Sequence, residues 1–373
     1  MNFVIEKEDF LNNLKIVEKA SVQKAIQPVL SNILLEASGK SVKFTATDTD
    51  FSIASSAIAQ VKKEGSITLP AKTLIEIASK IPNKPVTFEL NSENQTVKIS
   101  CGSSQFDVIG ISASEFPVNF EKLTNTEGFS KIQIESAPFV SAIKKTSFAA
   151  ANFETKNIIS GIYCSISEDE LEMAATDGNR LAQVIEKVTA KISEQTSVVI
   201  PAKCLLEIQR IYSLSEFDSI ELYLEDKKVL FKLGDVYIQS ALIEGTYPPY
   251  KQLIPTNYEK KLIADREEVI NAIERVAIMV SEKMNIVKFK LSDNKLYLSA
   301  DTPSEGMSED YLDVNYDFEE MSIAFNYRYI VDCLKVMETK KVVVGLNGSL
   351  SASVFKPEGE DNYICLIMPI QIR

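Results

Sequence analysis

The sequence predicts an α+β fold made of three consecutive repeats of one domain, each with two helices and an antiparallel sheet. The main observation is internal repetition, because similar segments recur at nearly constant spacing along the 373 residues. The second observation is that helical and strand patterns alternate in the same order within each repeat. The composition, 45% hydrophobic and 25% charged, is that of an ordinary globular protein. Each repeat therefore has enough apolar residues for a core.

Three landmarks recur between the first and second repeats. "LPAKTLIEIASK" at 69–80 matches "IPAKCLLEIQR" at 200–210, and their prolines lie 131 residues apart. The prolines that end "SEFP" and "GTYP" have the same separation. "TATDTD" and "AATDGN" place Asp48 129 residues before Asp177. Because the order and spacing of all three landmarks are kept, they indicate a duplicated domain.

A weaker third copy follows. "LSAD" ends at Asp301, 124 residues after Asp177, and "FNYRYIVDCLK" places Asn326 125 residues after Pro201. We therefore interpret Asp177 and Asp301, together with Asp48, as equivalent turn acids. The predicted domains are residues 1–125, 126–253 and 254–373.

Each repeat opens with an amphipathic helix. Phe10, Leu14 and Val17 share one helical face in the first copy, and the third copy carries acids in its first turn, which suit the helix dipole. Short strands such as "SVKFTAT", "ELEMAAT" and "KLYLSA" follow, then a second helix and strands such as "VTFEL", "IELYL" and "VVVGL". The predicted first helices span 8–19, 138–151 and 265–280, and the second helices span 71–81, 202–212 and 327–338.

The composition excludes several kinds of catalytic site. There is no histidine, which removes Ser-His-Asp and Cys-His catalysis and histidine metal ligation. Neither G-x-x-x-x-G-K-[ST] nor G-x-G-x-x-G occurs, so the common phosphate-binding loops are absent. The five cysteines form no C-x-x-C pair, which argues against a zinc site or a disulfide framework. We expect no cofactor and no metal.

The chain carries no signal for export or membrane insertion. Its first ten residues, MNFVIEKEDF, contain acids and no long apolar stretch, unlike a signal peptide. No apolar run approaches the roughly 18–20 residues that span a bilayer. We expect a cytoplasmic protein.

A basic stripe recurs on the second helix of each repeat. In each repeat one cation lies two residues after Pro70, Pro201 or Asn326. Another cation lies seven or eight residues later, on nearly the same helical face. The apolar side chains fall roughly opposite. The cations are Lys72, Lys80, Lys203, Arg210, Arg328 and Lys335. Solvated surface lysines would explain one such helix. Three equivalent helices in a protein of net charge −12 favour a common basic surface for a polyanion, bound through phosphates and without base readout.

The three repeats, "TDGNRLA", "EGTYPPYKQLIP" and the final "IMPIQIR" together resemble the bacterial DNA polymerase III beta subunit family, the sliding clamps, over the whole chain. The resemblance implies the DNA clamp fold, in which two subunits join head to tail in a ring, with sheets outside and helices lining the hole. Such a ring encircles duplex DNA without sequence preference and confers processivity on the replicative polymerase; it has no catalytic role. Lys24 matches a loop cation that contacts DNA in the family.

The resemblance also implies a hydrophobic pocket for short linear motifs of the replicative polymerase, the clamp loader, and repair and other polymerases. Two positions depart from the family, because Asn179 stands where His is common and Gln252 where Arg is common. An alternative for the tail is a C-terminal core strand capped by Pro369. The matching positions are Ile159, Thr176, Gly178, Arg180, Leu181, Pro248, Gln252, Leu253, Leu366, Ile367, Met368, Pro369 and Ile370.

For closure of the homodimer, the matching positions are Phe106 and Val108 in the first domain and Ile278 and Met279 in the third. All four are apolar, as an interface core needs, although they would equally suit an ordinary domain core.

Two other functions stay open. One is a repeat scaffold that binds proteins without DNA. The other is a Mg²⁺-dependent enzyme using Asp48 and Asp50, since paired carboxylates can hold this ion. The repeat argues against the enzyme, because the second and third copies read Asp-Gly-Asn and Asp-Thr-Pro and lose the partner acid.

Overall fold

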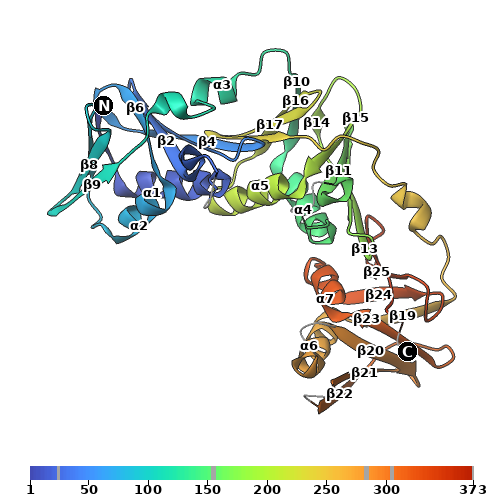
Figure 1. The fold of residues 1–373 in the computed structure, drawn as a ribbon. Coiled ribbons are helices and arrows are strands. Elements are labelled where there is room, and N and C mark those ends of the chain that lie inside the picture. Colours follow the sequence, from blue (N-terminus) through green and yellow to red (C-terminus); the bar gives the residue numbers. More distant parts are fainter. Residues whose placement is uncertain (23–25, 153–156, 281–284, 303–305, 372–373) are drawn as a thin grey trace. The chain divides into compact units, whose positions relative to one another are not determined.

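The computed structural model describes residues 1–22, 26–152, 157–280, 285–302 and 306–371. Its helices and antiparallel strands alternate in the predicted order, so the α+β prediction is confirmed (Figure 1). The chain divides into two compact units, residues 1–136, 191–193 and 207–242, and residues 137–190, 194–206 and 243–373. Within the ranges described, no helix is both long and apolar enough to cross a membrane.

The first two repeats contain the same succession of elements, and the third follows it with one strand fewer between its fourth strand and its second helix. The first has β1 (Asn2–Ile5), α1 (Lys7–Val17), β2 (Asn32–Ser38), β3 (Ser41–Thr47), β4 (Phe51–Ile58), β5 (Gln60–Lys63), β6 (Gly65–Pro70), α2 (Ala71–Lys80), β7 (Val86–Asn91), β8 (Thr96–Cys101) and β9 (Ser104–Ile109), followed by α3 (Phe120–Thr124). The second has β10 (Ser130–Glu135), α4 (Ser136–Thr146), β11 (Gly161–Ile166), β12 (Glu170–Thr176), β13 (Arg180–Lys187), β14 (Ala190–Lys191), β15 (Thr196–Pro201), α5 (Ala202–Leu214), β16 (Ser219–Glu225), β17 (Lys228–Leu233) and β18 (Val236–Ala241). The third has β19 (Lys260–Asp265), α6 (Arg266–Val276), β20 (Ile286–Ser292), β21 (Lys295–Thr302), β22 (Gly306–Asp313), β23 (Met321–Asn326), α7 (Tyr327–Lys335), β24 (Lys341–Leu346), β25 (Ser353–Pro357) and β26 (Tyr363–Ile367).

Sheets continue from one repeat into the next. The last strand of the second repeat, β18, pairs with the fourth strand of the first, β4, so that Ser240 lies opposite Phe51. The last strand of the third repeat, β26, pairs in the same way with β13, the fourth strand of the second, and Ile367 lies opposite Arg180. This continuity explains why the compact units do not follow the repeats: β16, β17 and β18 belong to the unit of the first repeat.

Two strands at these junction positions are left at sheet edges. β9, the last strand of the first repeat, ends the sheet of order β5-β1-β7-β8-β9. β22, the fourth strand of the third repeat, ends the sheet of order β22-β21-β20-β23. Each edge therefore presents backbone groups of the kind that form a junction elsewhere in the chain.

The turn between the third and fourth strands corrects one prediction. The carboxylate of Asp48 accepts the amide of Phe51, and that of Asp177 accepts the amide of Arg180, as expected for turn acids. Asp301 instead lies within β21, opposite Met307, so its interpretation as a third turn acid was wrong. The pairing of β12 with β13 ends at Thr176, before Asp177, whereas the pairing of β21 with β22 continues through Asp301 to Thr302.

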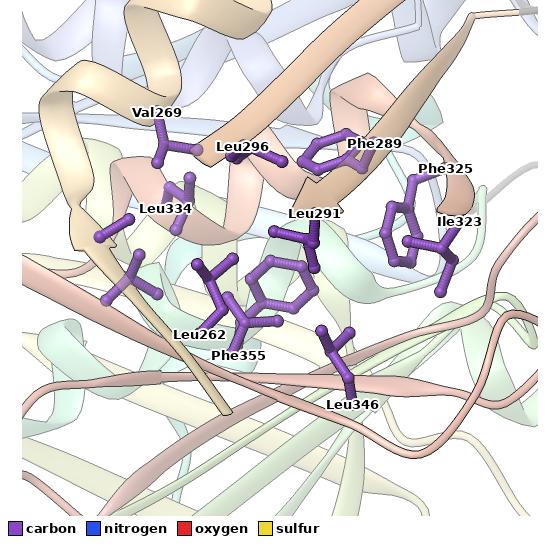
Figure 2. A pocket seen from close by; sticks show the side chains of 13 residues that line it. Leu262, Val269, Phe289, Leu291, Leu296, Ile323, Phe325, Leu334, Leu346 and Phe355 are labelled. Atoms are coloured by element: carbon purple, nitrogen blue, oxygen red, sulfur yellow. The ribbon is translucent and has the colours of Figure 1, made fainter. Parts of the chain in front are cut away.

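The core of the third repeat encloses a small cavity of about 20 Å³. Figure 2 shows apolar side chains from both sheets and from α6 and α7 pointing toward it, with only carbon atoms in the side chains drawn. A space of this size holds little more than one water molecule, and it offers no polar partner. It is therefore part of the hydrophobic core and offers no binding site.

Candidate peptide-binding site and nucleic-acid-facing helices

One apolar cluster brings together parts of the second and third repeats within the second compact unit. We call it the apolar cluster. Its buried members are Ala174, Leu181, Val199, Tyr247, Tyr250, Val354 and Leu366. They come from β12, β13, β15, the segment before the third repeat, β25 and β26. Partly buried side chains, including Ile158 and Ile254, pack against them. The cluster is the place where the predicted residues Leu181 and Leu366 meet.

The turn 176–180 stands beside this cluster and is built by its own side chains. The carboxylate of Asp177 accepts the amides of Asn179 (2.9 Å) and Arg180 (3.0 Å). The hydroxyl of Thr176 accepts the amide of Gly178 and donates to the carbonyl of Arg180 at 2.7 Å. Gly178 has φ of 90°, a conformation that suits glycine. The turn chemistry predicted from "TDGN" is present in full.

The C-terminal tail is held at two points, one on this turn and one on β23. The amide of Met368 donates to the carbonyl of Asn179 at 2.9 Å, and that of Ile370 donates to the carbonyl of Ala324 at 2.7 Å. Leu366 is buried in the apolar cluster, whereas Met368 keeps an exposed side chain. The neighbouring Ile367 is fully buried, opposite Arg180 in the sheet. The tail is thus a core strand up to Ile367 and a surface segment from Met368 onward.

Arg180 is held by four neighbours. Its guanidinium binds Asp177 at 3.0 Å and Asp332 of α7 at 2.7 Å. It also lies over the rings of Phe148 and Tyr329, 5.3 and 4.4 Å from their centres. With its side chain only 12% exposed, Arg180 fastens the turn to α7. Its side chain is committed to these contacts, so its effect on a bound ligand would pass through the turn.

The remaining predicted pocket residues lie at different depths. Pro248 is half-buried, and Gln252 and Leu253 are exposed on a 3₁₀ turn, η6 (Tyr250–Leu253). Ile159 is half-buried, and its carbonyl accepts the amide of Ala151.

Sequence reasoning missed the aromatic part of this region. The rings of Tyr163, Tyr247 and Tyr250 contact one another, with centres 5.8 to 6.1 Å apart. Burial raises the pKa of Tyr247 to about 12, so its hydroxyl stays protonated. Two of these tyrosines flank the prolines in "YPPY", a signal that could have been used. Val354 gives no such signal, because it is an ordinary strand residue.

The cations of the second helices fall into two groups. Lys72 and Lys80 on α2, and Arg328 on α7, are exposed on the side away from the core, as the stripe predicts. Lys203 on α5 is half-buried. Lys335 is exposed and pairs with Glu274 of α6 at 2.8 Å. In each unit the first and second helices of a repeat pack together, α1 with α2 and α6 with α7 (Figure 1).

Arg210 differs from the other cations. Its guanidinium binds Glu207 at 2.6 Å and donates to the carbonyl of Ile16, at the end of α1, at 3.0 Å. It therefore joins the second helix of one repeat to the first helix of the preceding one. Lys24 lies outside the described residues.

The predicted interface residues are found at the two junction strands or beside them. Phe106 and Val108 lie on β9, half-buried and buried. Ile278 and Met279 lie on the 3₁₀ turn η7 (Ala277–Met279), which follows α6, and Ile278 is 74% exposed. Sequence reasoning missed β22, where Met307 is 63% exposed. An edge strand cannot be told from an inner strand without knowing its neighbours.

The residues suggested for an enzyme do not form a metal site. Asp48 uses its carboxylate to accept the amides of Asp50 and Phe51 in the turn. In the part of the chain that the structure describes, no group of three or more Cys, Asp or Glu residues is placed to hold a metal ion. The fold is that of a protein built from three repeats that join through paired strands.

Comparison with known proteins identifies its family. The model of the DNA polymerase III beta subunit matches in three parts, the N-terminal domain over residues 1–121, the central domain over 133–249 and the C-terminal domain over 251–371. The chain belongs to this family.

Individual relatives agree along the whole length. The chain is 34% identical to the beta sliding clamp of Synechococcus elongatus over 380 residues, covering all of both chains. It is 32% identical to that of Staphylococcus aureus, covering all of this chain and 99% of the relative. Among solved structures, the DNA polymerase sliding clamp of Bacillus subtilis has a TM-score of 0.90 at 28% identity. The sliding clamp of Bartonella birtlesii, solved bound to griselimycin, has a TM-score of 0.91 at 27% identity, and both solved structures are covered completely.

Proposed function

We propose that this protein is a DNA sliding clamp, a non-catalytic homodimeric ring that encircles duplex DNA and tethers the replicative polymerase. Its family membership supports this function. We further propose that each chain contributes three clamp domains, residues 1–125, 126–253 and 254–373, and that the protein works in the cytoplasm.

The observation that carries the ring is the rule by which repeats join. In both junctions within the chain, the last strand of one repeat pairs with the fourth strand of the preceding repeat. Applied once more, the rule pairs β9 of one copy with β22 of a second copy. A head-to-tail contact of this kind forms a closed ring if the rotation per subunit closes. Two chains then supply six equivalent junctions.

Exposed apolar side chains beside the two free strands support this contact. Ile109 at the end of β9 and Ile278 on η7 are each 74% exposed, and Met307 on β22 is 63% exposed. Such side chains mark interaction sites when they gather. The proposed contact would cover all three.

The wild-type protein should have a mass in solution of about twice 41.5 kDa, and Met279→Lys should shift it to the monomer. A lysine forced into a closed apolar interface costs several kcal/mol, which raises the dimer dissociation constant at least about a hundredfold. Sedimentation or light scattering measures the change. Leu350→Lys is a matched control, because Leu350 is 63% exposed and belongs to the connection between β24 and β25, outside β9, β22 and η7. A wild-type monomer would contradict the ring.

For the lumen, we propose that Lys24, Lys72, Lys80, Lys203, Arg328 and Lys335 attract the DNA backbone. Such contacts are independent of sequence and weaken with salt, so they permit sliding. Arg210 stabilises the helix layer through its contact with α1 and adds its charge there.

For partners, we propose that the apolar cluster and its rim bind short linear motifs. Partner motifs would come from the replicative polymerase, the clamp loader, and repair and other polymerases. Buried leucines, three tyrosines and the exposed Met368 offer an apolar surface beside backbone groups of the 176–180 turn, which suits an extended peptide. Asn179 and Gln252 lie exposed near this surface, where they would tune motif preference.

Arg180→Ala should weaken binding of a fluorescein-labelled peptide from the polymerase about fivefold and leave the dimer intact. It removes two charged hydrogen bonds that hold the turn, at a cost of about 2 kcal/mol in the free energy of unfolding. Fluorescence anisotropy measures affinity, and urea unfolding measures stability. Arg180→Lys keeps the charge but lacks the forked donors of the guanidinium, so its peptide affinity and stability should lie between those of the wild type and Arg180→Ala. Lost stability with unchanged affinity would assign Arg180 a purely structural role.

A further inference from the structure

A buried carboxylate lies beneath the rim of the proposed peptide site. Glu172 of β12 is only 7% exposed and accepts three hydrogen bonds. The donors are Nε2 of Gln183 at 2.6 Å, Oη of Tyr250 at 2.7 Å and Nζ of Lys251 at 2.8 Å. Gln183 and Tyr250 share Oε1, and Lys251 takes Oε2. Both oxygens of the carboxylate are therefore engaged.

These donors come from opposite sides of the site. Gln183 lies on β13, two residues after Leu181 and thus on the same face of the strand. Tyr250 and Lys251 begin η6, whose other two residues, Gln252 and Leu253, are the exposed rim. One carboxylate thus connects the strand wall to the 3₁₀ turn that forms the rim.

The rim has little other support from regular hydrogen bonding. η6 has no side-chain cap, and the prolines before it supply no amide donors. In the segment "YPPYKQL", the amides of Tyr250 and Gln252 make short bonds to the carbonyls of Pro248 and Pro249, and the hydroxyl of Tyr247 donates to the carbonyl of Gly161 at 3.4 Å. The side chains of Tyr250 and Lys251 therefore connect η6 itself to the sheet, next to the bond that Tyr247 makes just before it.

The charge on Glu172 is stable at neutral pH. Burial alone would raise the pKa of its carboxyl, but the hydrogen bonds from Lys251, Tyr250 and Gln183 outweigh burial and hold the pKa below its usual value. Burial and the bond to Glu172 raise the pKa of Tyr250, so the tyrosine remains the donor. Removing the carboxylate would leave the buried hydroxyl and amide without their acceptor.

We propose that Glu172 is a positioning residue for peptide binding: it fixes η6 against β12 and so sets the place of the rim residues Gln252 and Leu253. This assignment rests on the proposed peptide site. Glu172 itself does not touch the peptide. It acts through Tyr250 and Lys251, and its loss would lower affinity by loosening the rim.

The test compares Glu172→Gln, Tyr250→Phe and Lys251→Met with the wild-type dimer. The probe is a fluorescein-labelled peptide from the C-terminal segment of the replicative polymerase, titrated by anisotropy. The rate of hydrogen exchange at the amides of residues 250–254 measures directly how often the rim opens. Glu186→Gln is the matched control, because Glu186 is also a partly buried, lysine-paired glutamate, bound to Lys145 at 2.7 Å on the helix side.

We expect Glu172→Gln to weaken peptide binding about tenfold and to speed exchange at 250–254 by a similar factor, with the dimer mass unchanged. Tyr250→Phe and Lys251→Met should each lower peptide affinity about threefold. Combined with Glu172→Gln, neither should lower the affinity further, because the effects of groups in one network are not additive. Glu186→Gln should stay within about twofold of wild type.

Wild-type affinity in Glu172→Gln, or unchanged exchange at the rim, would overturn the positioning role. A wild-type protein that does not bind the peptide would instead overturn the peptide site on which the role rests. If Glu172→Gln does not fold, the peptide affinities of Tyr250→Phe and Lys251→Met test the proposal instead, since both variants keep the carboxylate. Wild-type affinity in both would then refute the proposal.

Discussion

Protein loaded on a nicked circular plasmid will stay bound, and cutting the circle once will release it. The second helices offer only scattered cations to the backbone, and the protein as a whole carries a net charge of −12. Contacts of this kind are weak and fall steeply with salt. A closed ring would therefore be held by topology, and we expect its lifetime on the circle to exceed that on linear DNA at least about tenfold.

The measurement follows labelled protein with the plasmid on gel filtration, after loading by its own clamp loader and before and after a single restriction cut. Lys72→Glu with Lys80→Glu serves as a control for charge, since both lysines are exposed on α2. This variant should load less well and change the salt dependence, yet still depend on topology. Equal retention on circular and linear DNA would favour the scaffold that binds proteins alone.

Asp107→Cys combined with Met307→Cys will join two subunits by disulfides under oxidising conditions. Leu366 lies opposite Leu181, and Gln239 opposite Ser52, in the two junctions within the chain. Asp107 on β9 is equivalent to Gln239 on β18, because each lies three residues after the first paired residue of its strand, Ser104 or Val236. We place Met307 at the position of Leu181, because Leu181 lies opposite Thr176 at the end of β12 and Met307 lies opposite Asp301, one residue before the end of β21. The repeat rule therefore places Asp107 opposite Met307 of the second copy.

The side-chain directions agree with this register. Ser308 binds the carbonyl of Val276, and Asp310 binds the side chain of Arg275, both on α6. Because neighbouring strand residues point to opposite faces, Met307, which precedes Ser308, faces away from α6. Exposed Asp107 does the same on β9. Opposite Cα atoms in an antiparallel pair lie about 4.5–5.5 Å apart, within the range of about 4.4–6.8 Å that a disulfide allows.

A non-reducing gel should show nearly all of this variant as dimer. Asp107→Cys with Glu309→Cys is the matched control, because its cysteines would be diagonal neighbours about 7–8 Å apart and should bridge poorly. The native cysteines are buried and should not interfere. A crosslinked ring loaded on a nicked circle before oxidation should stay on it even in high salt. Efficient bridging of the control pair in place of the first would reject this register.

The sequence predicted the repeat, the order of helices and strands, and the turn chemistry, because these depend on local spacing and on side chains close in the chain. Asp48 and Asp177 act in their turns as expected, since each caps amides two or three residues ahead. Asp301 did not, because the pairing of β21 with β22 continues through it, which only strand register shows.

Side-chain partners were the harder part. Arg180 was predicted in the peptide pocket and Arg210 on the basic stripe, but their guanidiniums bind Asp332 and the carbonyl of Ile16, both more than 150 positions away in the chain. Glu172 likewise meets Tyr250 through the fold alone. Partners this distant depend on how the strands are ordered, and no spacing in one sequence reveals that order.

The shared strand pairing has a mechanical consequence for the proposed ring. Within a chain, each junction has its row of backbone hydrogen bonds and a covalent connection in parallel. Between chains, the same row would stand alone. If the ring is stretched or twisted, all junctions bear the strain, but the two without a covalent tether can part completely. The gate would then need no special sequence, because it lies wherever the polypeptide is interrupted, and fusing two chains end to end would leave one gate.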